Sequence, residues 1–225
     1  YHSLEAEQAA ASARAEAQKH LSEKVKDQEM LGSSTSYHSQ EAYQKWQSAL
    51  NEYGRLKKEQ ERVRQELLLL TGFSPDSPVV LEKMPLPDVS RAALVNPQED
   101  RQQALGNNYE LRSGRMGNAG SNQELHKKQR QTELDENQMF ASLETLGDQI
   151  RSCQTEWEAA CAKEQAQRAV WQSAVRKREL GTMAEGEYLE IYSQYMEEKG
   201  NQAQASIRFL LAMEEYDWAK KGLMD

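Results

Sequence analysis

The chain has no long hydrophobic run. The longest run of large apolar residues, Leu67–Leu70, is four residues long, whereas a membrane-crossing helix needs about 20 apolar residues. Only 38% of the residues are apolar, three are Phe, and the mean hydropathy is -0.90. This apolar share lies below that of a compact globular domain, which excludes a thick core. Long helices that share narrow apolar seams, or disorder, are the arrangements that remain.

Cysteine and clustered positive charge are also scarce. The two cysteines, Cys153 and Cys161, are eight residues apart, or about 12 Å along a helix. A disulfide needs Cα atoms within about 7 Å, so they cannot bridge each other, and we interpret them as small buried seam residues. The net charge of -8 argues against nucleic-acid binding. The short basic stretch His126–Arg130 is interpreted as a solvated helix face.

Catalytic patterns are missing as well. The sequence holds no Gly-rich phosphate loop behind a strand and no Ser/His/Asp or Cys/His arrangement. The histidines are scattered, without a second ligand at a metal-binding spacing. We therefore expect no enzyme, no cofactor and no metal site. The four histidines are His2, His20, His38 and His126.

The first 72 residues have the spacing of two helices. Small and apolar residues recur every three or four positions in Tyr1–Leu31, which predicts one helix. A second stripe follows until Gly72, a helix stop strengthened by Pro75. The first stripe is Ala10, Ala13, Ala17, Leu21 and Val25, and the second is Tyr43, Trp46, Leu50, Tyr53, Leu56, Val63, Leu67 and Leu70.

A proline-rich connector follows. Four of the five prolines lie in 73–96, which is too dense for a helix, and a short edge strand is expected at Val79–Leu81. A helix is predicted to begin near Pro97 and to run through Leu105 and Tyr109. Three glycines in Ser113–Asn122 predict something other than plain helix there.

The second half repeats the helical pattern. From Gln123 a heptad seam leads to Leu180, and a last helix after Gly181 ends at Gly222. The seam begins with Met139, Leu143, Leu146, Ile150, Cys153, Trp157 and Ala160. The last stripe is Tyr188, Tyr192, Tyr195, Ser206, Phe209, Met213 and Tyr216.

The two halves are an internal repeat. Leu31-Gly32 and Leu180-Gly181 are 149 positions apart, and several other identical residues match at the same offset. Each unit is predicted to be a long helical hairpin bent at Leu-Gly. The expected fold is all-α, with hairpin repeat 1 at 1–72, the connector at 73–96 and hairpin repeat 2 at 97–225. The other matched pairs are Ala10 and Ala159, Ala13 and Ala162, Ala17 and Ala166, Glu41 and Glu190, and Tyr43 and Tyr192.

The seams mix small, polar and aromatic residues among the aliphatic ones, unlike the nearly continuous Leu, Ile and Val of a buried coiled coil. Two arrangements fit this pattern. The helices could form the wall of a hollow, water-filled tube, in which each helix touches only its lateral neighbours. They could also form an ordinary coiled-coil spacer that binds partner helices by its seams, without transport.

The residues resemble the TolC-type outer-membrane efflux proteins, the exit ducts of tripartite export systems. The similarity lies in the order of the motifs: "AEQAAASARAEAQKHLSEKVKDQEMLGSSTSYHSQEAYQKW" running to "QELLLLTG", then "WEAACAKEQAQRAVWQSAVRKRELGTMAEGEYLEIYSQYMEE" running to "MEEYDWAKKG". The piece between them, with "MPLPD" and "ALGNNYELRS", is similar to the connector of that family.

The resemblance implies a structural export component in the outer membrane and periplasm or at the cell surface. Two hairpins per subunit would build an α-helical barrel, usually in a trimer, and the Leu-Gly turns would contact a periplasmic adaptor protein. Turn residues that only reverse the chain would have the same pattern. The candidate adaptor-binding residues are Leu31, Gly32, Ser33, Ser34, Thr35, Leu180, Gly181, Thr182 and Met183.

One segment departs from the family pattern. Members with a membrane barrel carry strands of alternating apolar and polar residues between the helices of each half. Tyr109–Gln123 shows no such alternation and has no room for two membrane strands. We therefore expect either a relative without the barrel, or strands outside this sequence. The leading hypothesis is a TolC-like duct subunit, and the alternative is an extracytoplasmic coiled-coil scaffold without transport.

Overall fold

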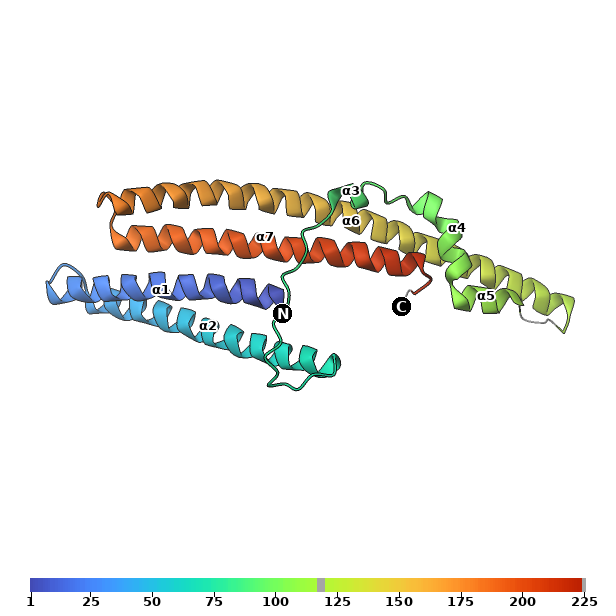
Figure 1. Cartoon of the computed structure of the whole chain (residues 1–225), viewed down its shortest axis with the longest axis horizontal. Helices are drawn as coiled ribbons and strands as arrows, with labels where there is room; N and C mark the ends of the chain where they lie inside the picture. Colours follow the sequence, from blue (N-terminus) through green and yellow to red (C-terminus); the bar gives the residue numbers. More distant parts are fainter. Residues whose placement is uncertain (117–119, 224–225) are drawn as a thin grey trace. The chain divides into compact units, whose positions relative to one another are not determined.

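The computed structural model describes residues 1–116 and 120–223. Within them all regular structure is helical, and two long helical hairpins are present, which confirms the predicted all-α fold (Figure 1). Contacts divide the chain into unit 1, Tyr1–Pro85 with Ala159–Ala205, and unit 2, Leu86–Glu158 with Ser206–Asp225. The helices are α1 (His2–Met30), α2 (Ser36–Leu70), α3 (Val89–Ala92), α4 (Pro97–Asn107), α5 (Tyr109–Met116), α6 (Asn122–Glu179) and α7 (Glu185–Lys220).

In unit 1, α1 packs antiparallel to the first part of α7 at very short range. A Cβ atom added at Gly200 would lie 3.5 Å from the carbonyl oxygen of Ala6, and one at Gly186 would lie 3.1 Å from Nδ1 of His20. Near the Gly200 end, Gln204 donates a hydrogen bond of 3.0 Å to Glu7. The two hairpins therefore approach each other closely at Gly200 and Gly186, against Ala6 and the larger His20.

The helices of the second hairpin also pair within unit 1. The ring of Trp171 on α6 stacks on Tyr195 of α7, with centroids 4.8 Å apart and an interplanar angle of 1°. Gln167 donates to Gln194 one turn further along, at 3.3 Å. Aromatic stacking adds to the energy of burial, so these rings help to hold the seam.

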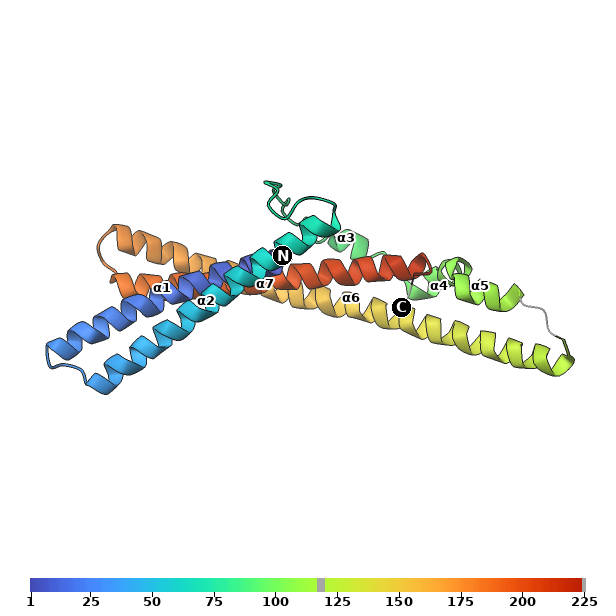
Figure 2. The same cartoon turned by 90° about the horizontal axis from the view of Figure 1, so that it is seen from below.

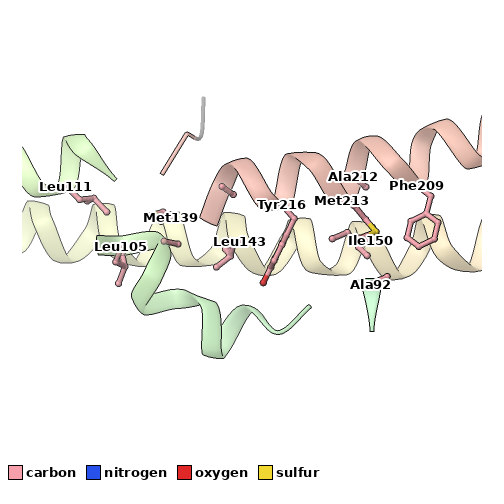
Figure 3. Packing of buried hydrophobic residues seen from close by; sticks show 12 residues of the cluster. Ala92, Leu105, Leu111, Met139, Leu143, Ile150, Phe209, Ala212, Met213 and Tyr216 are labelled. Carbon is pink, nitrogen blue, oxygen red and sulfur yellow. The ribbon is translucent and has the colours of Figure 1, made fainter. Parts of the chain in front are cut away.

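Unit 2 contains the main apolar cluster, in which Tyr216 and Phe209 are almost fully buried (Figure 3). Tyr216 Oη donates a 2.7 Å hydrogen bond to Asp100 of α4. Burial, then this carboxylate, raises the pKa of Tyr216. A Cβ atom at Gly147 would lie 2.8 Å from Pro97 Cγ, so α4 lies directly against α6. The cluster consists of Ala92, Ala104, Leu105, Leu111, Met139, Leu143, Ile150, Phe209, Ala212, Met213, Tyr216 and Ala219.

Two local predictions are wrong. Val79–Leu81 is not a strand, because the carbonyl oxygens of Ser77 and Val79 accept hydrogen bonds from Arg64, at 2.9 and 3.1 Å, in place of a neighbouring strand. The helix from Pro97 does not run through Tyr109. It ends at Asn107, and extended Asn108 accepts a hydrogen bond from the Leu111 amide, which caps α5.

The glycine-rich segment Ser113–Asn122 is only partly described. Helix α5 includes Gly114 and reaches Met116, Gly120 and Ser121 lie outside the helices, and α6 begins at Asn122. The remaining part of this prediction, 117–119, lies outside the described residues. Interruption of the helix is therefore confirmed at Gly120 and Ser121.

The cysteines are free and half-buried, as small seam residues. Cys153 packs against the unit 2 cluster, and burial, followed by the nearby Glu156 carboxylate, raises the pKa of its thiol. In unit 1, Gln202 donates to Cys161 Sγ at 3.7 Å. A raised pKa lowers the thiolate fraction, so Cys153 lacks the character of an activated cysteine.

Candidate functional site: the hairpin tips

Two five-residue turns, Leu31–Thr35 and Leu180–Ala184, connect the helices of the two hairpins. Both belong to unit 1 and lie at the same end of it (Figures 1 and 2). We call Leu31–Thr35 tip 1 and Leu180–Ala184 tip 2. The two turns have the same length and lie 149 residues apart, so they occupy equivalent positions in the repeat.

Tip 1 begins with a Schellman motif. Gly32 has φ +74°, and its N–H donates to the Glu29 carbonyl at 2.9 Å. The N–H of Ser33 donates to the Gln28 carbonyl at 2.8 Å, and Ser33 Oγ donates to the same oxygen at 3.0 Å. These bonds satisfy the last carbonyl groups of α1, and glycine is required because side chains disfavour positive φ.

Tip 2 repeats this motif. Gly181 has φ +69°, and its N–H donates to the Arg178 carbonyl at 2.9 Å. The N–H of Thr182 donates to the Lys177 carbonyl at 2.9 Å, and the Thr182 hydroxyl donates to the same oxygen at 3.0 Å. A Cβ atom at either Gly32 or Gly181 would meet nothing within 4 Å. Only the backbone conformation therefore demands glycine there.

Both tips expose a leucine. Leu31 is 82% exposed and Leu180 is 77% exposed. The structure places the predicted site residues in two groups of the same form, one at each tip. Gly32, Ser33, Thr35, Gly181 and Thr182 are exposed as well, whereas Ser34 and Met183 are half-buried.

The helices that leave the tips start differently. Thr35 is extended, and its side chain accepts a hydrogen bond from the His38 amide at 3.4 Å, which caps α2. The residue at the same place in tip 2 is Ala184, which has no acceptor. Tip 1 thus has a side-chain cap that tip 2 lacks.

Tip 2 has a brace that the sequence analysis missed. The Arg178 guanidinium forms a 2.7 Å ion pair with Glu185 across the turn, and it lies 4.2 Å from the centroid of the Tyr188 ring. At the 149-residue offset, tip 1 has Glu29, Ser36 and Ser39, which cannot form either contact. The sequence does contain an arginine and a glutamate seven residues apart. Their ion pair could be predicted only from the conformation of the loop between them.

Next to the brace lies a series of aromatic rings in contact, Tyr188, Tyr192, Trp171 and Tyr195, which we call the ring ladder. Tyr188 stacks on Tyr192 with centroids 6.3 Å apart, and Tyr192 lies 6.0 Å from Trp171, which stacks on Tyr195. Burial is the main cause of the raised pKa of Tyr192. In hairpin 1 the equivalent of Trp171 is Ser22, so its ladder is reduced to an edge contact of 5.6 Å between Tyr43 and Trp46.

The helices also end at a glycine of positive φ at the opposite ends of the hairpins, but there the residue after the glycine is apolar. Gly72 and Gly222 have φ +81° and +80°. The residue after each glycine, Phe73 or Leu223, donates its N–H to the carbonyl of Leu68 or Trp218, at 2.8 and 3.0 Å. At the tips the corresponding residues are polar. The four helix ends therefore share one backbone motif. A hydroxyl group adds a hydrogen bond to it at both tips and, through Thr71, at the far end of hairpin 1.

A polar groove of about 1220 Å³ lies in unit 1, between helices that lead to the tips. Its walls come from α1, α2 and α7, and most lining side chains are amides, hydroxyls or charged groups, among them Gln18, Gln47, Asn51 and Asn201. Oε1 of Gln18 is buried without a hydrogen-bond partner. The groove is therefore a water-compatible concave face, unlike the apolar lining of most small-molecule sites.

Two kinds of feature are missing from the described residues, 1–116 and 120–223. No group of three or more His, Cys, Asp and Glu is placed to hold a metal ion. None of the helices found there combines the length and the apolar character that a membrane crossing requires.

The fold and the tips define a protein of paired, laterally packed helical hairpins. No family model and no curated protein matches the chain. Among solved structures it is similar to the Campylobacter jejuni CmeC outer membrane channel, with a TM-score of 0.47 and 15% identity. The alignment covers 100% of this chain and 61% of the channel, so this chain spans less than two thirds of the channel's length.

Proposed function

We propose that the protein is a non-enzymatic, TolC-like duct subunit of an export system outside the cytoplasm. Copies assemble laterally as an oligomer, and the two tips dock end-on with a periplasmic adaptor protein. No cofactor takes part. The observation that carries this proposal is the equivalence of the tips, because two turns with the same glycine motif at one end of unit 1 suit a partner that meets a repeated surface.

The exposure at the tips supports a contact role beyond turning the chain. A helix-reversing turn needs the positive-φ glycine but gains nothing from an exposed leucine beside it, and both tips present one. Exposed apolar residues at the centre of a small polar surface are typical of protein–protein contacts. The motif resemblance of the two halves to efflux proteins supports the same assignment.

The docking test uses Leu31→Asp and Leu180→Asp, because both side chains are exposed and the fold should tolerate the change. Each variant should weaken binding of the purified adaptor of the same export system about tenfold or more, measured by calorimetry. Leu70→Asp is the matched control, since Leu70 is 85% exposed at the opposite end of hairpin 1. Unchanged binding by both tip variants would refute docking at the tips.

Lateral assembly is tested separately by molecular mass. Light scattering over a range of concentrations should give an oligomer at high concentration. A chain that stays monomeric throughout would contradict the duct and leave the scaffold alternative.

A further inference from the structure

The first turns of α6 have two opposite sides of different character. Met139 is buried in the unit 2 cluster, and Thr132, one heptad before it, is half-buried. Helix α5 lies beside this part of α6 (Figures 1 and 2), and its Leu111 belongs to the same cluster. On the other side, six residues that fall within about 100° of the helix circumference are all exposed. We call them the basic face: Gln123, His126, Lys127, Arg130, Leu134 and Asn137.

The charge of this face is opposite to that of the chain. It contains Lys127 and Arg130 and no acidic residue, whereas the chain as a whole has a net charge of -8. Glu133 borders the face on the side away from Lys127. The wider segment 109–130 has five Lys and Arg against two Glu. Because salt screens charges beyond about 10 Å, distant acidic residues leave this local positive potential in place.

The same face exposes an apolar side chain. Leu134 is 62% exposed, and it follows Arg130 by four residues and Lys127 by seven, so the three lie side by side. The alkyl stems of lysine and arginine extend past an apolar neighbour while their charged ends stay in a polar layer. Exposed leucine beside long cationic side chains is typical of helices that lie on a lipid surface.

We propose that the basic face binds an anionic phospholipid surface. Lys127 and Arg130 contact the phosphate groups, and Leu134 enters the boundary between the headgroups and the acyl chains. The leucine favours lipid over nucleic acid, because binding along a phosphate backbone is driven by charge and would leave Leu134 in water. This inference goes beyond the proposed function, and it depends neither on lateral assembly nor on docking at the tips.

The first test is binding of the full chain to vesicles, measured by co-sedimentation. Vesicles of equal parts phosphatidylcholine and phosphatidylglycerol are compared with vesicles of phosphatidylcholine alone. The chain should bind the anionic vesicles about tenfold more strongly, and the preference should shrink at high salt because it is electrostatic. Equal binding to both kinds of vesicle, or binding to neither, would overturn the proposal.

A double substitution assigns the binding to this face. Lys127→Gln with Arg130→Gln should lower binding to the anionic vesicles about tenfold or more, since each cation near such a surface contributes about a factor of five. Arg176→Gln with Lys177→Gln is the matched control, because it removes one lysine and one arginine charge at exposed positions near tip 2. The control should stay within about twofold of the wild type. Equal losses would mean that net charge alone matters, and would overturn the assignment.

A third variant separates a lipid surface from a soluble polyanion. Leu134→Ser should weaken binding to the anionic vesicles about threefold or more, because the serine has no apolar surface to insert. Its binding to dextran sulfate, which has no apolar phase, should equal that of the wild type. Vesicle binding that ignores this substitution would overturn the lipid assignment. All substituted side chains are exposed, and far-ultraviolet circular dichroism checks that each variant keeps its helices.

The outcomes are independent of those for the proposed function. A monomer that binds anionic vesicles through the basic face would refute the duct and leave this inference standing. An oligomer that ignores anionic vesicles would do the reverse.

Discussion

The two tips have one backbone and two different kinds of side-chain support. Each has five residues, a glycine of positive φ and an exposed leucine. Tip 2 adds the Arg178 brace and a ring ladder that includes Trp171. Tip 1 has Glu29 in place of Arg178 and Ser22 in place of Trp171, and it relies on the Thr35 cap.

The comparison shows that different residues determine the conformation of a tip and its resistance to opening. The shape depends on Gly32 and Gly181, because only the backbone conformation requires glycine there. The stiffness depends on contacts between the flanking helices, and only hairpin 2 has an extended set. We therefore expect tip 2 to open more rarely than tip 1, which hydrogen exchange at the two turns would measure.

Trp171→Ala is the substitution that should most reduce the difference in stability between the two hairpins. Loss of the ring stacked on Tyr195 removes a half-buried aromatic side chain, and the free energy of unfolding should fall by about 3 kcal/mol. Urea denaturation measures it. Ser22→Ala, at the equivalent position, should cost less than about 1 kcal/mol. Equal costs would mean that the ladder does not distinguish the hairpins.

Substitution of the turn glycines should destabilise the two hairpins by equal amounts. Gly32→Ala and Gly181→Ala each force a side chain into the left-handed region, which costs about 1–2 kcal/mol. Gly54→Ala is the control, since this α2 glycine has open space around it and should gain about 0.5–1 kcal/mol. Thermal unfolding of the three variants would reveal any inequality between the tips.

Exchange of the helix caps should shift the difference by a smaller amount. Thr35→Ala removes the acceptor of the His38 amide and should destabilise hairpin 1 by about 1 kcal/mol. Ala184→Thr supplies such an acceptor to α7 and should stabilise hairpin 2 by about 0.5–1 kcal/mol. Local exchange rates at the first turns of α2 and α7 are the readout. A destabilising Ala184→Thr would show that tip 2 cannot adopt a capped geometry.

The Arg178 brace should have the smallest effect. Arg178→Ala breaks an exposed ion pair and a cation–π contact, together worth about 0.5–1 kcal/mol, and its effect should shrink at high salt. Arg176→Ala, in the same helical turn and also exposed, is the matched control. Faster amide exchange at tip 2 in the first variant only is the expected result. The same rate in both would mean that the brace is inert.

The repeat made the hairpins and their turns predictable, because Leu-Gly recurs at a fixed offset between periodic stripes. The break at Asn108 was missed, since an asparagine inside a helical pattern caps a new helix only when the chain bends there. The Arg178 brace and the contact of His20 with Gly186 depend on which helices and turns are neighbours. A single sequence does not specify such tertiary contacts.

The junction of α1 with α7 includes residues with no rotamers to lose. Burial of Gly200 and Ala10 orders no side-chain torsions, whereas seating a tyrosine or an arginine freezes several. The contact inside the chain therefore forms without this entropic cost. A contact with a separate molecule that seated such long side chains would incur this cost on each association, so the junction within the chain has an entropic advantage over it.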